Sequence, residues 1–341
     1  MSDVRLIIER AGLSWLIDRG VRGWAQYGLP EGGPLDKRAA LAAWAWTGRT
    51  DGGKPWWLEI GPLPFVLRIS RPMRVVLLGA VREVRLSGEA LPASAGGVLG
   101  CCFQAQGGAT LRLGPAPSCG PTYLTAQADL ADPADDGLHH RGPMVRRMAD
   151  GDAVALRFTD TPSAAGRKLI LLGTRVTQYV QVPKDDVPLR FMAGPEYEAI
   201  RQNVHGVDGA VELRGEPVWR FGVSSQMDRQ AVRLTPLQSD REWRMSTVSL
   251  AESSPTVTGL IQWPTGGRPM ILRHDRQTMG GYPRLGSVIA ADWRRLAWLK
   301  PGGSLVLRPV DRVEAMQAYG QEERVDRLLQ QLLRLAGTAG D

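Results

Sequence analysis

Short apolar runs separated by glycine, proline and aspartate dominate the chain. The runs are rich in β-branched residues and leucine, and this composition and length are typical of strands. We expect strands at 4–8, 64–69, 75–78, 81–86, 109–113, 153–158, 169–172, 211–213, 218–223, 270–273 and 304–307. Because turn residues punctuate these runs so often, the pattern predicts a mainly β protein rather than a helical bundle.

Four segments carry helical signals instead. Asp36 is a candidate N-cap for a helix over 37–46, since its carboxylate can accept the free N–H groups of a first turn. Pro195 occupies a suitable first helical position before 196–202. Apolar residues at helical spacing predict further helices over 288–299 and over 313–335.

Composition sets the class of protein and its division. The chain has 341 residues, of which 43% are hydrophobic and 23% charged, as in soluble globular proteins with more than one core. The stretch 181–191, QVPKDDVPLRF, is polar, contains two prolines and separates two β-rich halves. We therefore expect an N-terminal domain over 1–185, a second over 186–311 and a helical tail over 312–341.

Charge and hydropathy argue against two classes of partner. The net charge is +7, but the arginines are spread along the chain, whereas nucleic-acid-binding proteins concentrate them in a patch. No apolar run reaches the roughly 20 residues of a membrane helix. The first residues, MSDVRLIIER, contain no apolar signal-peptide core. We expect a cytoplasmic protein with no nucleic-acid or membrane partner.

Cysteine and histidine argue against a metal centre. The chain has 3 cysteines and 4 scattered histidines, with neither a CxxC nor an HExxH motif. An odd number of cysteines in so long a chain does not suggest a disulfide framework. The sequence therefore predicts no metal site.

Two stretches are unusually rich in glycine and polar residues. The first, 18–36, holds five glycines between acidic ends, and the second, 259–292, places glutamine, arginine, aspartate and tyrosine around a Gly-Gly pair. Such backbones can approach a ligand closely, and a loop of this kind suits carboxylate or phosphate binding. The alternatives are a tight strand-to-helix connection for the first and a barrel-edge loop with mutually paired charges for the second.

The second stretch carries a family resemblance. Its core reads Gln277-Thr278-Met279-Gly280-Gly281-Tyr282-Pro283, and it resembles the hallmark of the KipA/PxpC family, which includes the C subunit of 5-oxoprolinase and proteins described as allophanate hydrolase subunit 2 or biotin-dependent carboxyltransferase. The residues in register with the family pattern are Gln262, Pro264, Gly267, Pro269, Leu272, Asp275, Gln277, Thr278, Gly280, Gly281, Tyr282 and Pro283.

The N-terminal half matches the family less completely. It keeps Asp18, Gly20, Gly23, Gly28, Pro30, Gly33, Asp36 and the Leu58-Glu59-Ile60 element. Ile17 and Val21 stand where the family usually has glutamine and arginine. The chain is thus similar to a divergent member. The resemblance implies two β-barrel domains, the C-terminal one cyclophilin-like, with a few short helices and a C-terminal helix.

The resemblance also implies a function. It suggests the C subunit of an ATP-dependent 5-oxoprolinase, a component of a hydrolase that is inactive alone and acts with a KipI/PxpB-like partner and a PxpA-like subunit to cleave 5-oxoproline to glutamate. ATP would be shared with the partner subunit. Two alternatives remain: a carboxyltransferase-like subunit acting on urea or a related amide, and a KipA-like regulator that binds a KipI-like kinase inhibitor. None of the five lysines has a methionine neighbour, so we expect no biotin on this chain.

Both the 5-oxoprolinase and the carboxyltransferase-like hypotheses require recognition of a planar amide near an anion. The second stretch offers suitable groups. Gln262 and Gln277 can each donate to and accept from an amide. Arg276 or Arg284 can hold a carboxylate or phosphate.

The same reading supplies candidate catalytic groups. Tyr282 can donate to a developing oxyanion, and Asp18 or Asp275 can act as a base if it is sufficiently buried. Thr278, Gly280 and Gly281 complete the predicted substrate-binding set.

Overall fold

A computed structural model describes residues 4–49, 53–92, 98–131, 145–158, 170–171, 186–205, 211–213, 216–237, 244–245, 252–264 and 268–338. The chain divides into two compact units. Unit 1 consists of Met1–Gly20, Gly32–Gln181 and Arg324–Asp341, and unit 2 consists of Val21–Glu31 and Val182–Glu323.

This division differs from the expected domains at two places. The segment Val21–Glu31 lies in the N-terminal part of the sequence but belongs to unit 2. The C-terminal helix forms no separate tail, because its residues up to Glu323 belong to unit 2 and those from Arg324 onward belong to unit 1. The main boundary, between Gln181 and Val182, falls close to the expected one at 185.

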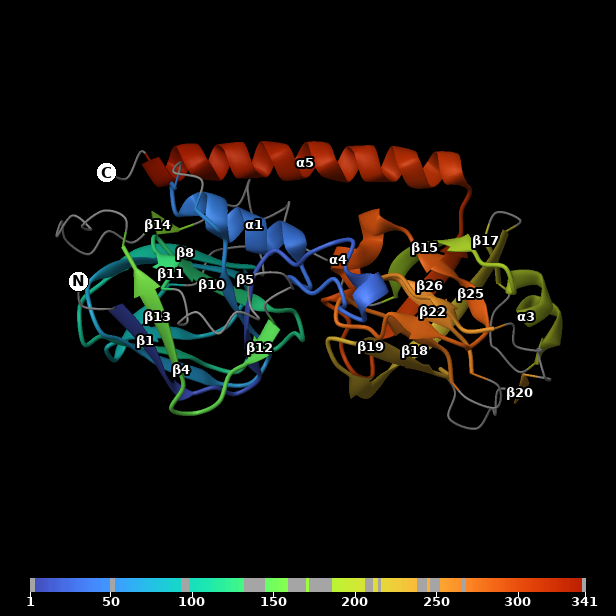
Figure 1. Ribbon diagram of the computed structural model, residues 1–341, viewed down its shortest axis with the longest axis horizontal. Coiled ribbons are helices and arrows are strands. Elements are labelled where there is room, and N and C mark those ends of the chain that lie inside the picture. Colours follow the sequence, from blue (N-terminus) through green and yellow to red (C-terminus); the bar gives the residue numbers. More distant parts are fainter. Residues whose placement is uncertain are drawn as a thin grey trace. The chain divides into compact units, whose positions relative to one another are not determined.

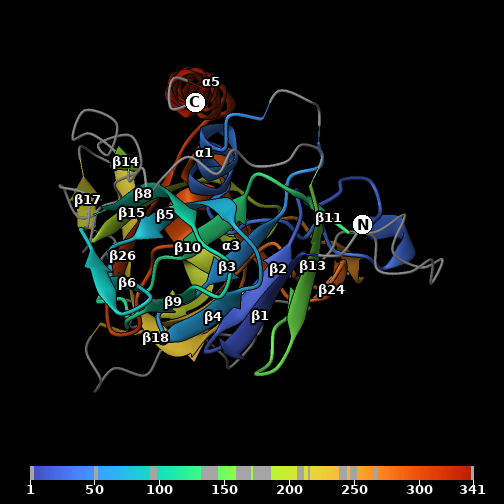
Figure 2. The same cartoon turned by 90° about the vertical axis from the view of Figure 1, so that its left-hand side faces the viewer.

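Unit 1 contains two seven-stranded sheets. The first has the order β11-β13-β1-β4-β9-β6-β7. Its strands are β1 (Val4–Arg10), β4 (Phe65–Ile69), β6 (Val84–Leu86), β7 (Glu89–Leu91), β9 (Thr110–Leu113), β11 (Asp129–Leu130) and β13 (Ala153–Arg157). The second has the order β12-β2-β3-β10-β5-β8-β14 (Figure 2). Its strands are β2 (Ser14–Ile17), β3 (Trp57–Ile60), β5 (Met73–Ala80), β8 (Val98–Ala105), β10 (Thr122–Ala126), β12 (Val145–Arg147) and β14 (Ile170–Leu171).

Burial along the strands explains this arrangement. In β1 the residues alternate, with Val4, Leu6 and Ile8 buried, as expected for a sheet that has one face toward the core. Every residue of β5 is buried, because helix α1 (Lys37–Trp46) also packs on β5 and β10. The many alanines of α1 allow this close approach, and the Asp36 carboxylate accepts from the Ala39 N–H at 3.1 Å, which confirms the predicted cap.

Unit 2 is built on a closed barrel of seven strands. Its sheet runs β18-β19-β23-β22-β25-β15-β26, and β26 pairs again with β18, while β17 (Val211–Leu213) extends the sheet beyond β18. The barrel strands are β15 (Val187–Ala193), β18 (Glu216–Met227), β19 (Ala231–Thr235), β22 (Leu260–Gln262), β23 (Met270–Leu272), β25 (Arg284–Val288) and β26 (Ser304–Pro309) (Figure 1). Inside it, the ring of Trp263 meets those of Trp219 and Phe221 edge to face at centroid distances of 5.7 and 6.0 Å. The expected mainly β fold with a C-terminal barrel is confirmed.

Short elements complete unit 2. They are the 3₁₀ turn η1 (Ala25–Tyr27), helix α3 (Tyr197–Asn203), and the two-stranded pairs β16 (Val204–His205) with β20 (Arg244–Met245) and β21 (Ser254–Pro255) with β24 (Met279–Gly280). Helix α3 lies one residue from its predicted position at 196–202.

The predicted helix over 288–299 is wrong in its first half. Strand β25 continues to Val288, a 3₁₀ turn η2 covers Ala290–Asp292, and helix α4 spans only Trp293–Leu296. Val288 pairs with Phe191 of β15. The buried Asp292 carboxylate accepts from the backbone N–H and the guanidinium of Arg190, each at 2.8 Å. These sheet contacts outweigh the helical pattern of the sequence.

Helix α5 (Arg312–Thr338) confirms the expected C-terminal helix. Ala318 packs with Ile289 and Ala291 in unit 2, whereas Leu329 and Leu333 join the core of unit 1. Among the described residues, neither α5 nor any other helix combines the length and apolar character needed to cross a membrane.

Candidate functional site

The second glycine-rich stretch lies at one end of the unit 2 barrel. Gln262 ends β22 and lies opposite Arg284, the first residue of β25, at a register shift between the two strands. Between them the chain forms β23, a loop over 273–278 and strand β24, which pairs with β21. The barrel register and this small sheet therefore bring the polar residues of the motif to one edge.

Two glutamine amides meet at this edge. The Gln262 side chain is 1% exposed, and its Oε1 accepts from Nε2 of Gln277 at 3.5 Å. Gly280 lies against the same amide, because a Cβ at this position would stand 2.6 Å from Nε2 of Gln262. The missing side chain at Gly280 is thus what allows the Gln262 amide to occupy its place.

Two buried threonines support the motif loop. The Thr256 backbone N–H donates to the carbonyl oxygen of Thr278 at 2.9 Å, and its hydroxyl donates to that of Gln277. Arg276 donates to the Thr258 hydroxyl at 3.0 Å and to the Thr256 carbonyl at 3.3 Å. The sequence analysis missed both threonines, although their alternation around Val257, just before the motif strand, was a usable signal.

The first glycine-rich stretch contributes a carboxylate to this cluster. Glu31 belongs to unit 2, and its Oε2 accepts from the Thr258 hydroxyl at 3.4 Å. Its Oε1 accepts from Nε of Arg22 at 2.8 Å. Burial lowers the pKa of Arg276, and the charge of Glu31 acts against that decrease. The sequence analysis missed Glu31, because in this stretch only the glycines suggested ligand binding.

Part of the first glycine-rich stretch is hydrogen-bonded within itself. The Gly20 N–H donates to Oδ1 of Asp18 at 2.8 Å. The N–H groups of Val21 and Gly28 donate to the carbonyl oxygens of Glu31 and Ala25 at 2.8 and 3.0 Å. These three N–H groups therefore bond within the stretch and are not available to a phosphate.

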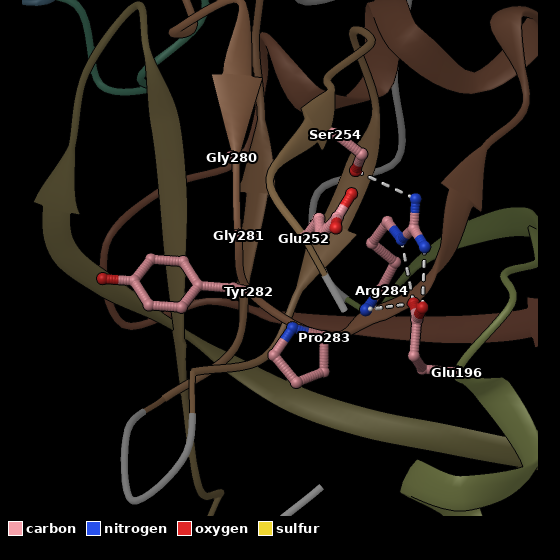
Figure 3. A pocket seen from close by; sticks show the side chains of 8 residues that line it. All are labelled: Glu196, Glu252, Ser254, Gly280, Gly281, Tyr282, Pro283 and Arg284. Atoms are coloured by element: carbon pink, nitrogen blue, oxygen red, sulfur yellow. Dashed lines mark hydrogen bonds and ion pairs between the residues drawn. The ribbon is translucent and has the colours of Figure 1, made fainter. Parts of the chain in front are cut away.

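Arg284 is held by an acidic partner. Its guanidinium and backbone N–H bind the Glu196 carboxylate at 2.6 to 3.0 Å, and Nη1 donates to the Ser254 hydroxyl at 2.9 Å (Figure 3). Hydrogen bonds from Arg284 lower the pKa of Glu196. These three residues line a small hollow, open to solvent, together with Glu252, Gly280, Gly281, Tyr282 and Pro283.

Tyr282 is available for a ligand. Its side chain is 46% exposed and, among the described residues, forms no hydrogen bond. The ring points away from the Arg284–Glu196 pair (Figure 3). Thr278 and Gly281 are half-buried beside it in the same stretch.

The two candidate bases lie in different settings. Both carboxylate oxygens of Asp275 accept from the buried Arg229 guanidinium, at 2.7 and 3.1 Å. Asp18 follows β2 in unit 1, whereas the other candidate residues belong to unit 2. Each unit by itself therefore supplies one candidate base. Within the described part of the chain, no three acidic, histidine or cysteine side chains cluster closely enough to hold a metal ion.

Residues 27–309 match the family model of the carboxyltransferase domain, subdomain A and B. The chain belongs to this family. A relative named as the C subunit of 5-oxoprolinase, from Escherichia coli strain K12, is 27% identical over 331 residues, which cover 94% of this chain and 96% of the relative. These matches confirm the resemblance found in the sequence.

Solved structures show the same fold. The urea carboxylase of Kluyveromyces lactis matches with a TM-score of 0.70 at 18% identity, covering 95% of this chain and 29% of that longer chain. TTHA0988 matches with a TM-score of 0.64 at 22% identity, covering 91% of this chain and 57% of its own. The present chain thus spans only part of these structural relatives.

Proposed function

We propose that this chain is the C subunit of an ATP-dependent 5-oxoprolinase that cleaves 5-oxoproline to glutamate. It would act with a KipI/PxpB-like subunit and a PxpA-like subunit, and would be inactive alone. The observation that carries the proposal is the end-to-end similarity to a protein named as the C subunit of 5-oxoprolinase, which extends through the motif at the barrel edge. ATP is a requirement of the assembled complex, and this chain supplies the surface that binds the cyclic amide.

The geometry of the motif supports a role in binding an amide. Gln262 and Gln277 together present carbonyl and NH₂ groups, the pair of functions that complements a lactam C=O and N–H. The exposed Tyr282 hydroxyl is a suitable donor to an oxygen that gains negative charge when the lactam carbonyl is attacked. Asp275, fixed by Arg229, is the candidate base in unit 2, and Asp18 is the candidate in unit 1.

The test is 5-oxoproline-dependent ATP hydrolysis, measured first with this chain alone and then with both partner subunits. We expect turnover only in the mixture, and its loss in Gln277→Ala and Tyr282→Phe with the fold intact. Turnover that is unchanged in both variants would remove the motif from the active site. A stable complex without any turnover would contradict the 5-oxoprolinase assignment.

A carboxyltransferase-like reaction on urea or a related amide is the second candidate. It is favoured by the family model and by the fold shared with urea carboxylase. Since none of the lysines lies in a biotin-acceptor sequence, this reaction would need a separate biotin carrier. Carboxyl transfer from a carboxybiotin carrier to urea, in the absence of the 5-oxoprolinase partners, would favour this candidate.

A further inference from the structure

The two arginines of the motif differ in what compensates their charge. Arg284 faces the Glu196 carboxylate with its backbone N–H, Nε and Nη2, and Ser254 with Nη1. Within the part of the chain that the structure describes, Arg276 donates only to the Thr258 hydroxyl and the Thr256 carbonyl, and its Nε has no hydrogen-bond partner. Among the described residues, no carboxylate lies within ion-pair distance of Arg276.

Arg276 is therefore a buried cation that lacks a full counter-charge. Its side chain is 6% exposed, and a charge removed from water is costly unless an opposite charge and hydrogen bonds satisfy it. The desolvation is visible in the lowered pKa of the guanidinium. Neutral oxygens satisfy only two of its five N–H groups, so an anion that reached it would gain charge-assisted hydrogen bonds.

The surroundings of Arg276 match a ligand that carries both a carboxylate and an amide. Gln277 is the next residue, and its side chain contacts that of Gln262. Thr256 and Thr258, both buried, bind Arg276, and Thr256 also holds the carbonyl oxygen of Gln277. The cation and the two amides are thus connected by hydrogen bonds through the same short segment.

Glu31 is one hydroxyl away from the guanidinium. The Thr258 oxygen accepts from Arg276 at 3.0 Å and donates to Glu31 at 3.4 Å. Arg22 pairs with the other Glu31 oxygen at 2.8 Å. Glu31 therefore compensates Arg276 through space without occupying its donors, and an arriving anion would be repelled by that carboxylate.

We propose that Arg276, rather than Arg284, is the receptor for the substrate carboxylate, and that Glu31 is its internal counter-charge. The identity of the substrate as 5-oxoproline rests on the proposed function, whereas the preference of Arg276 for a carboxylate does not. Arg284 serves to position the β25 edge through Glu196.

The direct test follows the Arg276 Nε–H resonance in ¹⁵N-arginine-labelled protein, assigned by its absence in Arg276→Gln. The folded chain is titrated with sodium acetate, with sodium chloride at equal ionic strength as the reference. We expect a saturable shift of this resonance with acetate, and the same with 5-oxoproline at lower concentration. No shift with either carboxylate would overturn the proposal.

A second test compares 5-oxoproline with 2-pyrrolidinone, the same lactam without a carboxylate, by isothermal titration of the full chain. Because charge-assisted hydrogen bonds to the carboxylate would be lost, we expect Arg276→Gln to weaken 5-oxoproline binding about 10- to 100-fold and to leave the affinity for 2-pyrrolidinone unchanged. Arg276→Lys should recover part of this loss. The matched control is Arg201→Gln, which replaces an exposed, ion-paired arginine of α3. It should change the affinity for neither ligand.

Glu31→Gln tests the counter-charge. Because it removes the repelling carboxylate, we expect 5-oxoproline and acetate to bind several-fold more tightly. Weaker binding would overturn the role given to Glu31. If acetate shifts Arg276 while the assembled complex fails to hydrolyse 5-oxoproline, the receptor stands and the proposed function falls. If the complex is active and Arg276→Gln binds both lactams as the wild type does, the proposed function stands and the assignment of Arg276 as the carboxylate receptor falls.

Discussion

Two buried polar clusters, one in each unit, contain family-motif residues but are completed to different degrees. In unit 1, the Asp36 N–H donates to the Tyr123 hydroxyl at 2.7 Å, and that hydroxyl donates to Glu59 at 2.9 Å. The same Glu59 oxygen accepts from the Leu35 N–H at 2.9 Å. In unit 2, Arg276 has only neutral acceptors among the described residues, and its Nε has no partner there.

The difference separates stability from binding. A closed network of buried hydrogen bonds rigidifies the core around it, so Asp36, Glu59 and Tyr123 hold α1 against the sheet of unit 1. An incompletely compensated charge costs stability and is typical of functional sites. Motif residues of the two stretches therefore serve different purposes, although the sequence presents them alike.

The largest expected effect is on the unit 1 cluster of Asp36, Tyr123 and Glu59, which we call the closed cluster. Glu59→Ala should lower the free energy of unfolding by about 3 kcal/mol, since it leaves the Tyr123 hydroxyl and the Leu35 N–H buried without an acceptor. Urea denaturation measures this. Glu83→Ala, whose exposed carboxylate pairs with Arg85, is the control and should change stability by less than about 0.5 kcal/mol. Equal effects would mean that the Glu59 network does not stabilise unit 1.

A neighbouring pair of glycines sharpens the comparison in unit 2. Gly280→Ala should cost about 2 kcal/mol and weaken 5-oxoproline binding, because its Cβ would displace the buried Gln262 amide. Gly281→Ala should be milder, since its Cβ would stand 3.3 Å from the Ser253 hydroxyl. Thermal unfolding and ligand titration of both variants test this. Identical behaviour of the two variants would argue against the role of Gly280.

Removing the central charge of the unit 2 cluster around Arg276 should not destabilise the protein, in contrast to the loss of Glu59 in unit 1. Arg276→Met should leave the free energy of unfolding unchanged or raise it by about 1 kcal/mol, because it removes an incompletely compensated buried charge. Urea denaturation again measures the change. A decrease of about 2 kcal/mol or more, approaching that of Glu59→Ala, would show that Arg276 is needed for folding and would end the contrast between the clusters.

The last expected effect is a pH dependence of stability, which appears only under alkaline conditions. Burial, followed by the charges of Glu59 and Asp36, raises the pKa of Tyr123 well above its ordinary value. Above about pH 10 the unfolded chain releases this proton and the folded chain retains it. The stability present below about pH 10 should therefore fall as the pH rises, by up to about 1.4 kcal/mol per pH unit.

Tyr123→Phe removes this contribution and should make the alkaline decline less steep. Urea denaturation at a series of pH values from about 8 to about 11 compares the variant with the wild type. Parallel curves for the two proteins would contradict the raised pKa of Tyr123.

The sequence predicted much of the fold through local chemistry. Asp36 caps α1 because a short carboxylate before a helix-forming segment has few other favourable arrangements. Helix α5 forms as predicted because its apolar stripe is long and regular. The helix predicted over 288–299 did not form in its first half, because Val288 pairs with β15 and Asp292 pairs with Arg190.

For the site, the sequence by itself determined the family, the motif and the kinds of groups present. It could not choose between Arg276 and Arg284, because both are arginines of one motif, and only the fold shows that Glu196 pairs with Arg284 while Arg276 bonds to neutral oxygens. It missed Glu31 and Thr258, which lie 227 residues apart. Only the tertiary structure decides such matters, since the burial and compensation of a charge depend on neighbours that the fold brings together from distant parts of the chain.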